Sequence, residues 1–276
     1  MLGAFYNINI ELGDFQDDPL THILDASLKI TKVAEYLSCV HIITRPVEAT
    51  LLPTGQNLYH AISTLPTPWL TFAYRIKSKA IFKEALIHAA GQWNTAGVQE
   101  AVADGRLPGK VLEILEAKAN FIRSGVIMAE RHLASYYPSM LMRERTVGLV
   151  GSDNIGRANY ANDIIMWMAL TVFRHWCSDM MATDQTHNSR DMGHGFMRAI
   201  SIGGNEYLSR DVLQNQFHQR FPMSHKGMAC VEHRLNEIKD IVKQWAMVSS
   251  PDTLLKRAPG ADRDLATHAV QYRTGQ

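Results

Sequence analysis

Apolar residues recur every three or four positions along most of the chain, which is the spacing of one face of an α-helix. The longest such stripe follows Pro108 and continues for about seven turns. Its members are Val111, Leu115, Ala119, Ile122, Val126, Ala129, Leu133 and Tyr136. We therefore predict one long helix that ends before Pro138 and buries this stripe. The charged residues expected in water on its other face are Glu113, Glu116, Arg123 and Arg131.

Shorter helices are predicted in the first hundred residues, separated by proline and glycine. Their expected ranges are 20–39, 41–52, 54–64, 66–74 and 79–90. The first carries a stripe made of Leu20, Ile23, Leu24, Ser27, Leu28, Thr31, Ala34 and Leu37. Proline is tolerated in the first turn of a helix, so Pro53, Pro66 and Pro68 mark helix starts. Ser78 is the expected N-cap of the last of these helices, and Gly91 its end.

Two further helices are predicted in the second half, at residues 157–181 and 230–248. The second has one apolar face, formed by Val231, Leu235, Ile238, Ile241, Val242 and Trp245. The apolar run 164–173 is about half of the length that spans a membrane, so we interpret it as a buried core helix. Strand-like alternation occurs only at Phe5–Leu12, and the fold class is therefore all-α, a multi-helix bundle. Residues 138–156 are a loop or a domain boundary, and residues 249–276 a flexible tail.

Composition narrows the function classes only slightly. The 276 residues are 46% hydrophobic and 20% charged, with a formal net charge of +1, which excludes a general affinity for polyanions. The three cysteines are too few and too scattered for a disulfide framework, and no secretory leader is visible at the start of the chain. We expect an intracellular protein, cytoplasmic or nuclear, with no membrane association.

Histidine and cysteine residues form two groups that could bind a metal ion. The first contains Cys177, His187 and His194, and the second His218, His225, Cys230 and His233. Structural zinc sites place their ligands in close pairs, and Cys230 with His233 is the single such pair here. We therefore assign no metal and no cofactor. A metal- or cofactor-binding helical enzyme that uses these groups remains the alternative.

Motifs of enzyme active sites are absent, so we assign no catalytic residue. The glycine-rich stretch 201–205 lacks the Gly-Lys-Ser/Thr of a phosphate-binding loop and is expected to be a turn. Asp17 and Asp18 are interpreted as acids at a helix start, and Cys39 as a small buried thiol. Aromatic and methionine side chains in 166–181 are expected to pack in the core, with a ligand pocket as the alternative. These are Met166, Trp167, Met168, Phe173, Trp176, Met180 and Met181.

Residues 26–93 resemble the region that follows the core of fungal BTB/POZ-domain proteins. The resemblance consists of a helix with Lys-Val-Ala-Glu-Tyr-Leu at 32–37, the pair Leu51-Leu52, Gly55-Gln56, and the Ile81–His88 helix. The helix at 163–176 also resembles a later part of those chains. This resemblance implies that residues 1–52 are the closing helices of a BTB domain and 53–248 a BACK-like helical extension. It also implies that most of the BTB sheet is missing, since only about 25 residues precede the matching helix.

The preferred function is a non-enzymatic protein–protein interaction module, an adaptor or scaffold similar to fungal BTB proteins. Its protein partner is unknown from the sequence. A specific nucleic-acid partner is not expected, because the basic spots at 143–145 and 256–257 are too short. We expect a monomer, with a homodimer as the alternative, because the later helices carry enough apolar surface to cover the first one.

Overall fold

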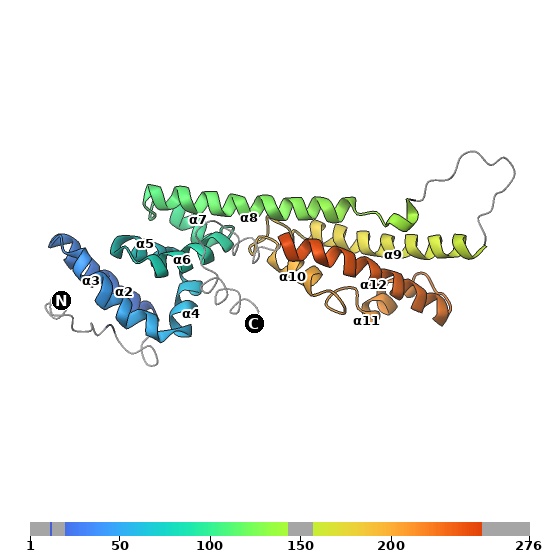
Figure 1. Ribbon diagram of the computed structural model, residues 1–276, viewed down its shortest axis with the longest axis horizontal. Coiled ribbons are helices and arrows are strands. Elements are labelled where there is room, and N and C mark those ends of the chain that lie inside the picture. Colours follow the sequence, from blue (N-terminus) through green and yellow to red (C-terminus); the bar gives the residue numbers. More distant parts are fainter. Residues whose placement is uncertain (1–11, 13–19, 143–156, 250–276) are drawn as a thin grey trace. The chain divides into compact units, whose positions relative to one another are not determined.

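The computed structural model describes Leu12 and residues 20–142 and 157–249. Every regular element in these ranges is helical, which confirms the all-α class for this part of the chain (Figure 1). The chain divides into two compact units: unit 1 comprises residues 1–122 and 254–276, and unit 2 residues 123–253. The expected strand lies outside the described residues except for Leu12, which is not in a strand, and so do Asp17, Asp18 and nearly all of the expected tail.

Unit 1 contains a series of short helices close to the predicted ranges. They are α2 (Leu20–Tyr36), α3 (Val40–Leu51), η1 (Leu52–Thr54), α4 (Gln56–Thr64), α5 (Pro66–Ile76), α6 (Lys79–Gly91), α7 (Ala96–Ala103) and the first half of α8 (Gly109–Ser135). Pro66 occupies the first turn of α5, as predicted. The Ser78 hydroxyl accepts a hydrogen bond from the backbone N–H of Ile81, which confirms the predicted cap of α6.

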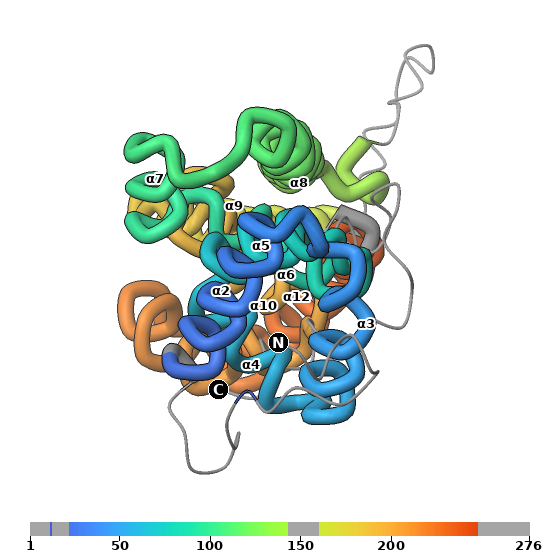
Figure 2. Tube along the Cα trace, turned by 90° about the vertical axis from the view of Figure 1, so that its left-hand side faces the viewer, coloured from blue at the N-terminus to red at the C-terminus, as the bar shows by residue number. Residues whose placement is uncertain are grey.

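Helix α5 lies at the centre of unit 1 and contacts α2, α3, α4, α6 and α7 (Figure 2). Its central position follows from its sequence, because most of its residues are apolar and fully buried. Trp69 and Phe72 pack edge to face within it, with ring centroids 5.6 Å apart. Glu35 of α2 accepts two hydrogen bonds from the Arg75 guanidinium, which ties the first helix to the end of α5.

Helix α8 confirms the longest predicted stripe. All eight of its apolar members, from Val111 to Tyr136, are buried. Glu113, Glu116 and Arg131 are exposed and Arg123 is half-buried, as the amphipathic pattern requires. The boundary between the two units falls inside this helix, after Ile122.

Unit 2 contains the second half of α8, η2 (Ser139–Leu141), α9 (Arg157–Ala182), α10 (His194–Ile202), α11 (Arg210–Val212), η3 (Leu213–His218) and α12 (His225–Ser249). Helix α12 packs against both α9 and α10, and α9 and α12 are seen side by side in Figure 1. The Tyr136 ring packs edge to face on Phe173 at 6.4 Å and on Trp245 at 5.4 Å. This aromatic cluster joins the end of α8 to α9 and α12.

Four apolar side chains that we placed on packed helix faces are exposed. Leu37 is 54% exposed because α2 ends at Tyr36, before the predicted end of this helix at residue 39. Ile164 and Trp167 of α9 and Ile241 of α12 each have more than 40% of their surface exposed. The interpretation of 164–173 as a fully buried segment is therefore wrong. The apolar pattern marks which residues can pack, but a helix with apolar residues on several faces buries only those that meet a neighbour. None of the helices described here is long and apolar enough to cross a membrane.

Candidate functional site

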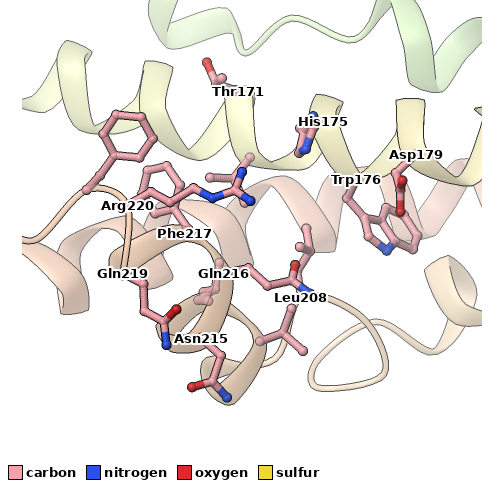
Figure 3. A pocket seen from close by; sticks show the side chains of 14 residues that line it. Thr171, His175, Trp176, Asp179, Leu208, Asn215, Gln216, Phe217, Gln219 and Arg220 are labelled. Atoms are coloured by element: carbon pink, nitrogen blue, oxygen red, sulfur yellow. The ribbon is translucent and has the colours of Figure 1, made fainter.

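A pocket of about 550 Å³ opens in unit 2 between the second half of α9 and the segment that follows α10. Its volume falls in the range of sites that bind small molecules or side chains of a partner. The residues of α9 that line it are Thr171, Val172, His175, Trp176 and Asp179. The opposite wall consists of Leu208, Val212, Leu213, Asn215, Gln216, Phe217, Gln219, Arg220 and Phe221 (Figure 3).

The wall opposite α9 has an irregular backbone. Ser209 caps the short helix α11 by accepting a hydrogen bond from the backbone N–H of Val212. The chain then continues as a π-helical turn, η3, rather than as an α-helix. A π-helical turn is wider than an α-helical one and occurs frequently at functional sites. Here η3 supplies Asn215, Gln216 and Phe217 to the pocket.

The charged groups of the pocket come from both walls. Figure 3 shows the Arg220 side chain extending toward Thr171 and His175, whereas Asp179 and Trp176 lie at the other end. Within the described ranges, the Arg220 guanidinium has no ion-pair or hydrogen-bond partner, and no hydrogen bond joins His175 to Asp179. The pocket therefore presents a cation that can pair with an acidic ligand.

Aromatic rings form a large part of the pocket walls. Trp176 stacks on Tyr207, with ring centroids 4.3 Å apart, and also contacts Phe196 of α10 at 5.4 Å. Phe217 and Phe221 pack on each other at 5.3 Å. These contacts fix the orientation of Trp176 and leave part of its ring facing the pocket. Such rings can bind apolar side chains with little loss of conformational entropy.

A buried lysine, Lys239 of α12, holds the backbone of the segment that forms one wall of the pocket. Lys239 is 2% exposed, and its ammonium donates hydrogen bonds to the carbonyl oxygens of Gly204 at 2.8 Å and Leu208 at 3.0 Å. It also lies 5.1 Å from the centre of the Tyr207 ring, a cation–π contact. Burial lowers the pKa of Lys239 to about 8, against the attraction of Glu232 and Asp240. Lys239 thus holds the loop that carries Tyr207 and Leu208.

Two further buried groups beside the pocket are chemically unreactive at neutral pH. Burial raises the pKa of the Cys177 thiol to about 12, so it stays protonated. Burial also raises the pKa of Tyr207, whose hydroxyl has no hydrogen-bond partner among the described residues. Neither group has the lowered pKa of an activated nucleophile.

The candidate metal ligands do not converge. Among the residues that the structure describes, no group of three or more His, Cys, Asp or Glu side chains could hold one metal ion. The His187 backbone N–H and ring Nδ1 bond Glu130 at 2.8 and 2.7 Å, which ties the turn after α9 to α8. His233 pairs with Glu237 on its own helix at 3.4 Å. Burial lowers the pKa of His218, whose Nδ1 has no hydrogen-bond partner in the described part of the chain.

The predicted aromatic stripe of α9 divides between core and surface. Phe173 is fully buried as predicted, Trp167 is exposed, and Trp176 lines the pocket, which is the alternative that we considered less favourable. The sequence analysis did not identify Phe217 or Arg220. A signal was present in residues 213–221, a stretch without helical periodicity in which four amide side chains lie beside aromatic and basic ones. The stretch 201–205, predicted to be a turn, begins with the last two residues of α10 and turns only from Gly203, with positive φ at Gly203 and Gly204.

Comparison with protein families gives one match, to the fungal family of the FF domain, a helical protein-interaction domain. The match covers residues 138–249, which include all of the residues that line the pocket. No curated protein matches the chain significantly. No solved structure does so either.

The resemblance to BTB/POZ and BACK domains is wrong. No BTB model matches the chain, and the FF match includes residues 163–176, which we had compared with a later part of BTB chains. The resemblance rested on short helical stretches that occur in the same order in both kinds of chain. Helices of unrelated proteins share alternating Leu, Ala, Lys and Glu because amphipathic packing demands it, so their order alone does not identify a family.

Proposed function

We propose that this protein is a non-enzymatic protein–protein interaction module, and that the pocket of unit 2 binds a short segment of a partner protein. The observation that carries the proposal is the Arg220 guanidinium, which has no partner in the part of the chain that the structure describes and lies beside aromatic walls in a pocket of about 550 Å³. The similarity of residues 138–249 to the FF domain supports the same class of function.

The chemistry of the walls defines the ligand that would fit. Arg220 favours an acidic side chain, because a carboxylate can accept two hydrogen bonds from a guanidinium. Trp176 and Phe217 favour a large apolar side chain nearby. Exposed amides at Asn215, Gln216 and Gln219 can form hydrogen bonds with polar side chains of a peptide. We therefore expect a peptide that has an acidic residue close to an apolar one.

The lack of an arranged catalytic group favours binding over catalysis. Cys177 is held as a thiol, and His175 is not oriented by Asp179 in the described structure. A nucleophile with a base and an orienting group is the usual requirement for covalent catalysis. A metal-dependent reaction at the histidine groups has no support from the described residues.

Peptide display tests the proposal. The full-length protein is used to select from a library of random 16-residue peptides, and the affinities of the enriched peptides are measured by fluorescence anisotropy. Arg220→Glu should weaken the binding of the enriched peptides at least tenfold, because it repels their acidic group. Arg190→Glu is the matched control, since Arg190 is exposed in the same unit and does not line the pocket.

Two results would contradict this proposal. The first is a selection that enriches no peptide above background. The second is a set of enriched peptides that bind the wild type and Arg220→Glu equally well. Circular dichroism of both variants shows whether the helical fold is preserved.

A further inference from the structure

The α9 wall of the pocket continues into an exposed apolar stripe. Tyr160, Ile164 and Trp167 are 60%, 41% and 48% exposed, respectively. They are spaced by four and three residues, so they lie on one face of α9. Thr171 and His175 continue the same spacing and already line the pocket. The pocket and this stripe, defined as residues 160, 164 and 167, therefore form one continuous surface along α9.

The half-exposed Trp167 ring is held in place from one side. Tyr137 packs edge to face on it, with ring centroids 5.8 Å apart. The Arg174 guanidinium lies over the Tyr137 ring, 5.7 Å from its centre. It also donates a hydrogen bond to the Tyr136 carbonyl oxygen at 2.8 Å. A large aromatic side chain that is exposed and yet fixed loses little entropy when a partner covers it.

The helical rise gives the distance between the stripe and the cation. At 1.5 Å per residue, Thr171 and His175 lie about 6 and 12 Å beyond Trp167 along the axis of α9. Arg220 extends toward these two residues (Figure 3). A ligand that covers the stripe therefore meets the cation about one to two helical turns further along.

We propose that the partner segment is an amphipathic helix that lies along α9; this rests on the proposed function of the pocket. Its apolar residues, spaced by three and four positions, cover Tyr160, Ile164 and Trp167. An acidic side chain one to two turns away pairs with Arg220. The three-and-four spacing of the exposed residues on α9 and the cation further along the same surface favour this occupant.

The backbone of the partner gives an independent reason for a helix. An extended peptide usually binds by adding a strand to the edge of a sheet, which satisfies its backbone N–H and C=O groups. The described ranges of this chain contain no strand that could offer such an edge. A helix satisfies its backbone internally and needs only side-chain contacts.

The test uses substitutions on the stripe and a matched control. Ile164→Gln and Tyr160→Gln replace exposed apolar groups by a residue that favours helices. Ile241→Gln is the control, because Ile241 is 45% exposed on α12 of the same unit and does not line the pocket. The binding partners are the display-selected 16-residue peptides, each also synthesised with a central proline that prevents helix formation.

Ile164→Gln and Tyr160→Gln should each weaken peptide binding at least fivefold. The proline peptides should bind the wild type at least tenfold more weakly than the selected peptides do. The control Ile241→Gln should bind the peptides as the wild type does. Circular dichroism of the complex should show additional helix relative to the separate components. Peptides that depend on Arg220 but not on Ile164 or Tyr160, or that bind equally with proline, would overturn the helix proposal and leave the pocket function standing. Binding that depends on neither Arg220 nor the stripe would overturn both.

A second copy of this chain is the alternative occupant of the stripe. Light scattering across a hundredfold dilution distinguishes it. We expect one monomeric mass at all concentrations. A dimer that persists on dilution and is lost in Ile164→Gln would show that the stripe binds another copy instead of a partner helix, and would contradict the proposal.

Discussion

The two units treat their charged side chains differently. In unit 1, Glu84 and His88 are each 1% exposed and meet within α6 at 3.2 Å, and Glu35 pairs with Arg75. In unit 2, Arg220 extends into a pocket without a partner among the described residues, and Lys239 is held by two backbone carbonyls. The comparison indicates that these charges of unit 1 are paired within one helix or between two of its helices, whereas Arg220 of unit 2 is available to a ligand and Lys239 supports the pocket that would bind it.

The largest expected effect concerns the buried pair of unit 1. Glu84→Ala removes the hydrogen-bond partner of the buried His88 ring and leaves a cavity beside it, and we expect a loss of about 3–5 kcal/mol in the free energy of unfolding. Glu116→Ala, which removes an exposed carboxylate from α8, should change it by less than about 0.5 kcal/mol. Urea unfolding followed by circular dichroism measures both. Equal midpoints for the two variants would contradict the structural role of the pair.

Lys239 makes the stability of unit 2 depend on pH. Its pKa falls from 10.5 to about 8 on folding, so the unfolded chain binds more protons between these values. The wild type should therefore gain stability relative to Lys239→Met as the pH rises from 8 to 10.5, by on the order of 3 kcal/mol. Below pH 8 the difference should be constant. Unfolding free energies of both proteins across this range test the expectation, and a constant difference throughout would refute it.

A smaller effect is expected at Tyr207. Its buried hydroxyl has no hydrogen-bond partner in the described structure, so Tyr207→Phe removes a polar group that costs free energy to bury. The ring keeps its stack on Trp176 and its contact with Lys239. We expect the variant to be more stable by about 1 kcal/mol in thermal or urea unfolding. A loss of similar size would mean that the hydroxyl has a partner after all.

The smallest expected effect on stability is that of Arg220. Its guanidinium has no hydrogen-bond or ion-pair partner among the described residues, so Arg220→Glu should change the free energy of unfolding by less than about 0.5 kcal/mol. The same substitution should strongly reduce peptide binding. Thermal unfolding of this variant thus separates a binding residue from a structural one, and a large drop in melting temperature would assign Arg220 to the fold.

The sequence predicts the helices of this protein well and its surface poorly. The stripe from Val111 to Tyr136 is buried throughout because every third or fourth residue of a long helix faces the same side. The exposure of Trp167 could not be predicted, because it depends on which neighbouring elements reach that face. The pocket could not be predicted either, since the π-helical turn of η3 leaves no periodic pattern. Arg220 also lies 45 residues from His175 in sequence, although both line the pocket.

Hydrogen exchange tests most directly whether unit 2, and not unit 1, contains the binding site. The full-length protein is compared alone and saturated with the tightest display-selected peptide. The peptide should slow exchange in residues 171–179 and 213–221, where the two walls of the pocket lie, while α5 and α6 of unit 1 exchange unchanged. Protection confined to unit 1, or absent from both walls of the pocket, would contradict the account.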